Sequence, residues 1–486
     1  DAITTGSYNV AVGANAAGST TTGAQNIAVG QAALFTNTGG SFNVAVGDNA
    51  LTANTTASYN TAVGYQALTA NTTGINTAIG QSALAANTTG TSNTALGKNT
   101  LGSNTTASNN TGVGYQAGYS SNSGNGVQAL GYQAMYSNTS GDGTAVGYQA
   151  LYANTTGSQN TAVGYQALDA NTTASNNTAL GSLSLGANTT GGNNVAVGKS
   201  ALSANTTASN NNAFGTGALA LNTTGSANNA FGLDALGNNT TANHNSAFGS
   251  SALGANTTGA NNSGFGSNAL LLNTTGTNNV AVGAFALDAN TTGANNVAVG
   301  GSALGADTKG ERNVAIGYAA LEAQNFTTTT QSYNTVVGYF AGGSVTTGTR
   351  NTLIGGLAGD SLTTGVKNVA IGVGALSNDD VGSRSVAVGD SALASQNYAS
   401  ATDSYNTAVG NNAGLSVTTG VRNTLLGGLS ADALTTGNYN TALGYDSLGS
   451  ATTTSYNTAV GDSAMKLLTT GDRNTAIGQG AMMNNT

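Results

Sequence analysis

The strongest pattern in the chain is a short apolar motif that ends in glycine and recurs at a nearly constant spacing. At residues 62–64 it reads Ala-Val-Gly, and its glycine returns at positions 13, 30, 47, 64, 80, 97 and onward to 478. Most steps are 17 residues long. A fixed period of this length is typical of solenoids, in which one small unit stacks on itself. The pattern therefore predicts an all-β, parallel β-solenoid of about 28 coils.

Two columns of large apolar residues accompany the glycine. The residue before it is large and apolar in nearly every repeat, and a second column, mostly leucine, stands four residues after it. Side chains alternate across a strand, so an inward Val63 would place Ala62 outward. We expect two short strands and two bends per coil, with both large columns in the core. The predicted core residues include Val63, Leu68, Val163, Leu168, Phe214, Phe231, Phe248 and Phe265.

The first residue of the motif, two positions before the glycine, is small. Alanine occupies it in most repeats, where a solvent-facing strand would show Thr, Lys or Glu. A long column of small apolar residues predicts close approach of another chain, and the alternative is an ordinary surface that tolerates alanine. The predicted inter-chain face comprises Ala62, Ala78, Ala162, Ala196, Ala281 and Ala298.

An Asn-Thr-Thr tripeptide marks one corner of most repeats. Asparagine tolerates the left-handed conformation, and stacked coils would arrange its amides in a ladder. The same letters satisfy the N-glycosylation pattern, but glycans about 4.8 Å apart would crowd one another. We favour the ladder, with glycosylation as the alternative. The asparagines concerned include Asn54, Asn71, Asn87, Asn104, Asn154, Asn171 and Asn188.

The repeat runs through the whole chain, which we interpret as one continuous domain, 1–486. Its coils are regular over 1–305 and more divergent over 306–486. Two steps of 21 residues predict loop insertions near 322–332 and 394–404. Eight of the ten basic residues lie after residue 300, so charge distinguishes the two parts. Five basic residues directly precede a corner asparagine, namely Arg312, Arg350, Lys367, Arg422 and Arg473.

Composition narrows the functional classes. Only 6% of residues are charged and cysteine is absent, which excludes disulfides and thiolate metal sites. The net charge of -8 and the scarcity of Lys and Arg argue against a nucleic-acid partner. No apolar run has the length of a membrane span. The single histidine, His244, and the scattered carboxylates form no catalytic pattern, so we expect neither an enzyme nor a cofactor. The start at Asp1 instead of Met suggests a processed or excised piece.

The segment Asn-Val-Ala-Val-Gly-x-x-Ala-Leu, found at Asn194–Leu202 and Asn279–Leu287, carries a resemblance to a known family. It resembles the repeat of the YadA-like heads of trimeric autotransporter adhesins, and similar repeats occur in phage tail fibres. The resemblance covers essentially the whole chain, although Asn-Thr-Thr-Gly lengthens one corner here. It implies a left-handed parallel β-roll in a side-by-side homotrimer, with the alanine column at the trimer interface.

Together these features favour an extracellular structural and adhesive fibre, a stiff β-solenoid rod at a cell surface. Its expected partners are further copies of itself, side by side or end to end, and a surface receptor or glycan. A phage tail-fibre shaft, located on the virion, is the alternative in the same class. An ice-binding solenoid is the alternative of another class, but Thr72 and Thr73 are adjacent, so alternation would leave only one threonine column facing outward.

Overall fold

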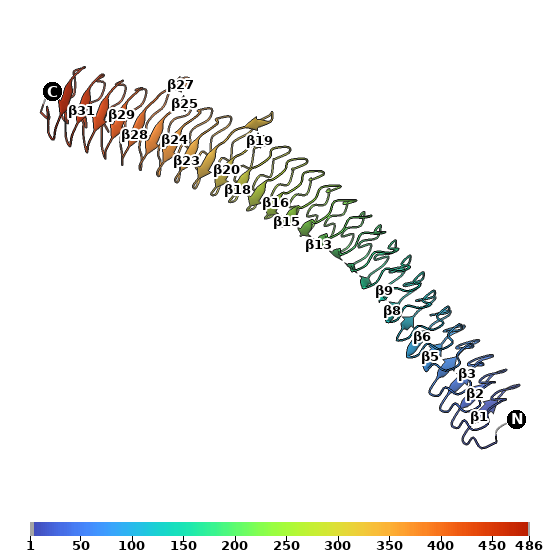
Figure 1. The fold of residues 1–486 in the computed structure, drawn as a ribbon. Helices are drawn as coiled ribbons and strands as arrows, with labels where there is room; N and C mark the ends of the chain where they lie inside the picture. The colour runs from blue at the N-terminus through green and yellow to red at the C-terminus, as the bar shows by residue number, and fades with distance from the viewer. Residues whose placement is uncertain (1–3, 485–486) are drawn as a thin grey trace. The chain divides into compact units, whose positions relative to one another are not determined.

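The computed structural model describes residues 4–484, in two compact units, Asp1–Ala242 (unit 1) and Asn243–Thr486 (unit 2). Each unit is a stack of coils, and the described residues contain no helix. Equivalent strands of successive coils pair in parallel, as Val10 does with Ile27 in unit 1 and Val280 with Val297 in unit 2. Figure 1 shows the strands following one another along each unit. The predicted all-β parallel β-solenoid with a 17-residue spacing is therefore confirmed.

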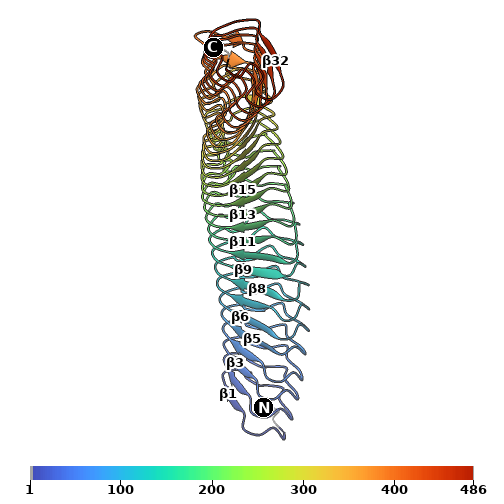
Figure 2. The same ribbon diagram turned by 90° about the vertical axis from the view of Figure 1, so that its left-hand side faces the viewer.

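Unit 1 carries one short strand per coil. Figure 2 shows these strands stacked above one another on the same side of the coils. Their bounds are β1 (Val10–Val12), β2 (Ile27–Val29), β3 (Val44–Val46), β4 (Thr61–Val63), β5 (Asn76–Ile79), β6 (Asn93–Leu96), β7 (Thr111–Val113), β8 (Val127–Leu130), β9 (Gly143–Val146), β10 (Asn160–Val163), β11 (Thr178–Leu180), β12 (Val195–Val197), β13 (Asn212–Phe214) and β14 (Asn229–Phe231).

Unit 2 repeats this arrangement and adds two short ribbons beside its longer coils. One ribbon pairs β19 (Gly310–Glu311) with β21 (Thr330–Gln331), and the other pairs β25 (Gly382–Ser383) with β27 (Thr402–Asp403). The one-per-coil strands are β15 (Ser246–Phe248), β16 (Ser263–Phe265), β17 (Val280–Val282), β18 (Val297–Val299), β20 (Val314–Ile316), β22 (Thr335–Val337), β23 (Thr352–Ile354), β24 (Val369–Ile371), β26 (Val386–Val388), β28 (Thr407–Val409), β29 (Thr424–Leu426), β30 (Thr441–Leu443), β31 (Thr458–Val460) and β32 (Thr475–Ile477).

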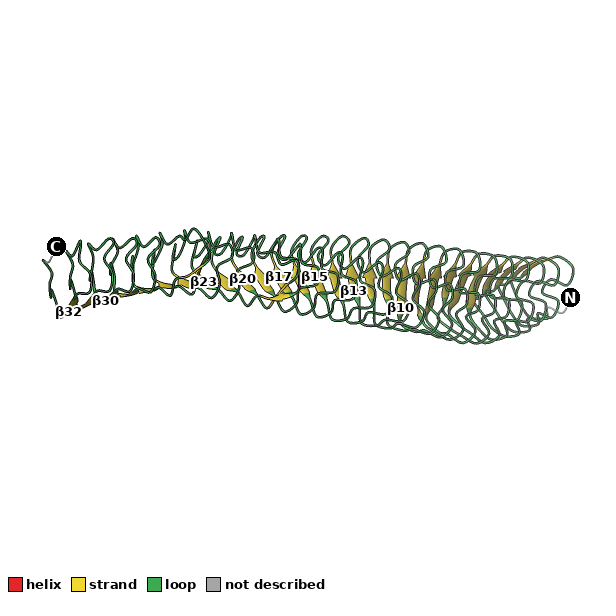
Figure 3. Ribbon diagram, turned by 90° about the horizontal axis from the view of Figure 1, so that it is seen from above, coloured by secondary structure: helices red, strands yellow, loops and turns green. Residues whose placement is uncertain are grey.

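Each strand is short because the chain turns directly after it. Behind β4, Gly64 has φ 135°, and Gln66 and Leu68 are left-handed at φ 57° and 50°. The amide of Gln66 donates to the carbonyl of Asp48 in the preceding coil (3.0 Å). The amide of Leu68 donates to Ala83 in the following coil (3.0 Å). The expectation of two strands per coil is therefore wrong, because alternating left-handed residues make the second side a run of tight turns. Figure 3 shows strands on one side of the coils and loop elsewhere.

The core of each coil lies between the central residue of the strand and the leucine of the turn. Leu68 and Leu168 have no exposed surface, which confirms the leucine column. The prediction that the column before the glycine lies in the core is wrong, because alternation permits either face and the strand turns this column outward. Val63, Val163 and Phe231 are only half-buried, and Phe214, Phe248 and Phe265 are exposed by 37 to 40%.

The alanine column is correspondingly inside the chain. The predicted inter-chain face is wrong, because these alanines are fully buried within a single copy and cannot touch another one. They are Ala62, Ala78, Ala162, Ala196, Ala281 and Ala298.

The interior of each coil has a fixed volume, so a large side chain in the turn leaves room for only a small one in the strand. This explains why the strand alanine lies opposite the leucine of the turn. Leu353 replaces the strand alanine in β23, and glycine then replaces the leucine at Gly342 and Gly359. A Cβ at Gly342 would lie 2.8 Å from a Leu353 methyl group, and one at Gly359 would lie 2.9 Å away. Leu425 and Gly414 repeat the exchange, with 2.6 Å for the added Cβ. Large and small residues are thus exchanged between the columns so that the interior stays filled.

Gly64→Ala tests the close approach of successive coils. The new Cβ would lie 2.5 Å from the carbonyl oxygen of Gly80, at a backbone angle that side chains rarely adopt. We expect the free energy of unfolding to fall by more than about 2 kcal/mol, measured by chemical denaturation. Gly39→Ala is the control, since its Cβ would meet nothing closer than Thr22 at 3.5 Å. Equal stability of the two variants would contradict the packing described here.

Leu236→Ala and Phe231→Ala, within one coil, test which side chains lie in the core and which lie on the outer face of the strand. Leu236 is fully buried, so its truncation should lower the free energy of unfolding by about 2 to 5 kcal/mol. Phe231 lies on the outer face and stacks on Phe214 at 4.6 Å, so its truncation should cost only about 1 kcal/mol. Denaturation curves that show the larger loss for Phe231→Ala would place Phe231, and not the alanine beside it, in the core.

Candidate interaction surfaces

The asparagine of each Asn-Thr-Thr corner forms a buried ladder, as predicted. Asn171 donates from Nδ2 to Oδ1 of Asn154 in the preceding coil (2.8 Å) and to the carbonyl of Ala174 (3.1 Å). Both amide hydrogens are used, and the side chain has no exposed surface. An N-linked glycan would have to replace one of these hydrogens, so the folded coil leaves no room for it.

The same arrangement holds along the corner. Asn54, Asn87, Asn104, Asn154 and Asn188 each donate to the ladder residue of the preceding coil, and Asn71 accepts such a bond from Asn87. All of these side chains are fully buried. A second ladder precedes the strands: the main-chain amide of Asn43 donates to Oδ1 of Asn26 (2.9 Å), and Asn43 Nδ2 donates to Ala57 (2.9 Å).

Buried aspartates replace the corner asparagine before each of the two longer coils of unit 2. Asp379 accepts from Nε2 of Gln396 (2.6 Å) and from the amide of Gly382 (2.9 Å). Burial raises the pKa of Asp379 to about 6, and the two hydrogen bonds only partly oppose this effect. Asp307 and Gln324 make the equivalent pair (2.7 Å), and burial raises the pKa of Asp307 as well.

Asp379→Asn should remove a pH-dependent loss of stability in unit 2. The folded-state pKa of Asp379, about 6, lies above the ordinary value of 3.8. The contribution of this carboxyl group to folding stability is therefore fully present below pH 3.8 and is lost as the pH rises through 6. An asparagine has nearly the same shape and carries no charge. We expect this variant to gain about 3 kcal/mol over the parent at pH 7 and less than about 1 kcal/mol at pH 4.

The measurement is the free energy of unfolding at both pH values. Asp390→Asn is the matched control, because Asp390 is exposed on the surface of the next coil. An Asp379→Asn variant that is less stable than the parent at pH 7 would show that the buried carboxylate is needed as an anion.

The outer face of the strands is a continuous uncharged surface. The two residues flanking the strand centre point outward, and across the one-per-coil strands they are Val, Ile, Leu, Phe, Thr, Ser, Asn or Gln. Leu96 and Leu180 are exposed by 46% and 48%. The solvated face of a sheet is normally polar, and a long exposed apolar face marks a site of association. This face therefore has the character that sequence reasoning assigned to the alanine column, and the exchange of large and small core residues was the signal that could have located it.

Ordered aromatic rows cover part of unit 1. The rings of Tyr115, Tyr132, Tyr148 and Tyr165 stack at 5.1 to 5.3 Å between successive centroids. A second row, Tyr119, Tyr136 and Tyr152, stacks at 5.3 Å. Glutamine amides between the rows bond from coil to coil, as Gln133 does to Gln116 (2.9 Å). The rings face one another along the stack, so their edges and hydroxyl groups are what they present to solvent.

The threonines of the corner differ in their availability. The hydroxyl of Thr72 donates to the carbonyl of Thr88 in the next coil (2.9 Å), and Thr172 donates to Thr189 in the same way (3.1 Å). The first threonine is thus used to join coils. Thr73, the second, is exposed.

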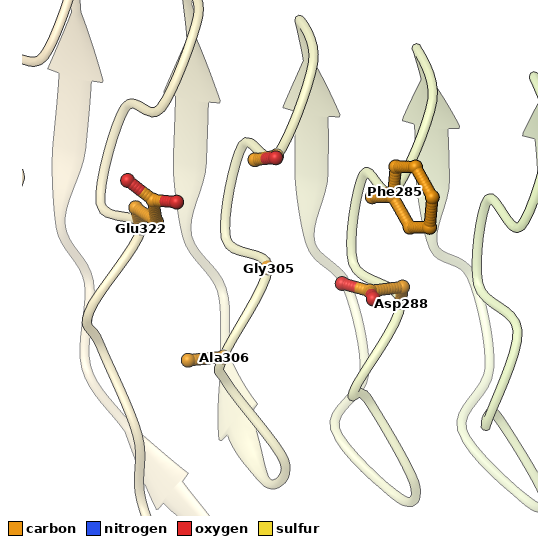
Figure 4. A pocket seen from close by; sticks show the side chains of 6 residues that line it. Phe285, Asp288, Gly305, Ala306 and Glu322 are labelled. Carbon is orange, nitrogen blue, oxygen red and sulfur yellow. The ribbon is translucent and has the colours of Figure 1, made fainter.

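A pocket of about 370 Å³ lies in unit 2. Figure 4 shows Asp288 and Glu322 on the coils to either side of Gly305, whose missing side chain opens the gap, with the Phe285 ring beside it. A Cβ at Gly305 would lie 3.3 Å from Asp288 Oδ1. Burial raises the pKa of Asp288. The lining holds two carboxylates and one hydroxyl, at Ser302, and no basic group.

Residues 4–484 contain no cluster of three or more His, Cys, Asp or Glu that could hold a metal ion. Within the same residues no helix has the length and apolar character needed to cross a membrane. The chain matches no protein-family model and no curated protein.

Proposed function

We propose that this chain is an extracellular structural and adhesive fibre protein whose copies pack side by side through the outer face of the strands. The observation that carries the proposal is the continuity of that face: coil after coil, an uncharged and largely β-branched or aromatic surface is left uncovered. Long exposed apolar surfaces on soluble proteins mark sites of association. The resemblance to YadA-like head repeats supports three copies per assembly.

The size of the face supports a stable interface. A strand of three residues spans roughly 10 Å and fourteen coils span roughly 65 Å, so the face of one unit covers roughly 650 Å². Stable interfaces bury about 800 Å² per partner. The face of either unit is therefore close to the area that a specific complex needs.

The coil construction suits a mechanical role. Neighbouring coils are joined through the strand, through the turn and through the asparagine ladder before the strand, and these bonds recur at nearly every step. The corner ladder adds further bonds in the coils up to Asn290. Unfolding one coil inside a stack would therefore break bonds on both of its sides. Such a structure gives stiffness and resistance to proteases, and repeated surface groups give many weak contacts at once.

Leu96→Lys combined with Leu180→Lys tests the proposed interface. We expect the parent chain to sediment as an assembly near three times 47.0 kDa and the double variant to sediment as a single chain, because like charges would face each other across the contact. The variant should remain folded, since both side chains lie outside the core.

Leu221→Lys is the control for this measurement. Leu221 is exposed by 51% but lies on a turn of unit 1 and not on a strand, so this variant should assemble like the parent. A parent chain that stays a single copy at all concentrations would refute the proposed lateral packing. Equal dissociation by Leu221→Lys would move the interface away from the strand face.

A further inference from the structure

One corner of unit 2 carries a single file of cations and tyrosines. It occupies the left-handed position two residues before the strand in ten successive coils, at φ 49 to 63°. We call this the basic corner. Its members, in coil order, are Arg312, Tyr333, Arg350, Lys367, Arg384, Tyr405, Arg422, Tyr439, Tyr456 and Arg473.

The basic corner is an ordered surface. The guanidinium of Arg312 lies 5.4 Å from the Tyr333 ring centroid and donates to its hydroxyl at 2.6 Å. Arg422 covers Tyr439 at 5.2 Å, and Tyr439 stacks on Tyr456 at 4.9 Å. Planar groups are thus held in position before any partner arrives, which lowers the entropy lost on binding.

The charge of the basic corner is concentrated and mostly uncompensated. Six of the ten basic residues of the chain lie in it, although unit 2 as a whole has more carboxylates than cations. Arg350, Lys367 and Arg384 occupy consecutive coils, about 4.8 Å apart, where like charges repel. Arg384 is paired with Asp403 (2.9 Å), whereas Arg350 and Lys367 have no ion-pair partner among residues 4–484. A negatively charged ligand would relieve this repulsion.

We propose that the basic corner binds an acidic polysaccharide, a glycan in which carboxylated sugars are spaced by neutral ones. The cations would pair with its carboxylates, and the exposed tyrosine edges and hydroxyl groups would contact the neutral sugars between them. This inference rests on the proposed adhesive role and identifies the chemical class of the surface to which the fibre would adhere.

The linear charge density distinguishes this ligand from a nucleic acid. Six cations over nine coil steps give about one positive charge per 9 Å. Duplex DNA carries one negative charge per about 1.7 Å and a single strand one per about 3.4 Å. Most phosphates of a bound nucleic acid would face tyrosines or the rest of unit 2, which is net acidic. A polysaccharide with more widely spaced carboxylates is therefore the better match.

Binding of the full chain to hyaluronate, whose carboxylated sugars alternate with neutral ones, tests the proposal by biolayer interferometry. We expect binding at about 50 mM sodium chloride that weakens at least about tenfold by about 200 mM. Arg350→Gln combined with Lys367→Gln should weaken it about tenfold. Lys98→Gln combined with Lys199→Gln is the matched control: it changes the net charge equally, lies in unit 1, and should leave binding unchanged.

Several results would overturn the proposal. These are no binding to hyaluronate at low salt, equal binding to neutral dextran, tighter binding to oligodeoxythymidylate, or equal loss in the Lys98/Lys199 variant. The Arg350/Lys367 variant should melt no earlier than the parent, because it removes a repulsion, so lost binding cannot be attributed to unfolding. Sedimentation of the same samples reports lateral assembly separately: hyaluronate binding by a chain that never assembles would refute only the proposed packing.

Discussion

In each unit, every residue of a coil lies against its equivalent in the next coil, joined by parallel main-chain hydrogen bonds at about 4.8 Å. This stacking in register decides which residues each position accepts. At Gly64 it admits no Cβ, because the carbonyl of Gly80 occupies the space. At Asn171 it selects an amide, which can donate to the coil before it and accept from the coil after it at the same time. A side chain that hydrogen-bonds to, or stacks on, the same residue type in the next coil stabilises the fold. A charged side chain that faces the same charge in the next coil destabilises it unless another group offsets the repulsion.

The second constraint is the narrow interior. Each layer holds only a few buried apolar side chains, such as Ala62, Ala67 and Leu68, so the core grows in length and not in width. Where Leu353 points into the core from the strand, glycine replaces the leucine of the turn at Gly342 and Gly359 and leaves room for its side chain. The cost of holding leucines such as Leu68 in a left-handed conformation, about 1 to 2 kcal/mol each, is offset by burying the side chain completely. Because each layer is thin, stability has to come from cooperation between layers, and hydrogen-bonded asparagine ladders that run from coil to coil supply part of it.

The sequence alone predicted what depends on periodicity, but the prediction that depends on the phase of the strand was wrong. The coil length, the parallel pairing and the amide ladder at Asn154 and Asn171 all follow from equal spacing. The strand faces do not, because alternation in a strand of three residues is equally compatible with Val63 or Ala62 inside. Only the exchange at Leu353 and its neighbouring glycines indicates that the alanine position is the internal one. The basic corner was visible in part, since Arg350 and Lys367 precede corner asparagines. Arg384 precedes Ser385, and the intervening tyrosines became members of the column only when the register of the longer coils was known.

Stacking in register also explains how charge is distributed in this chain. A charged residue repeated in every coil would face its own copies at the coil spacing, so most columns contain none, and the outer strand face is uncharged for this reason as well as for any partner it binds. The basic corner departs from that rule. Tyrosines separate some of its cations, and Arg422 packs on the ring of Tyr439. No tyrosine lies between Arg350 and Lys367. A column with adjacent like charges, in a chain that otherwise avoids them, lowers the stability of the fold, and the proposed acidic ligand would account for its presence.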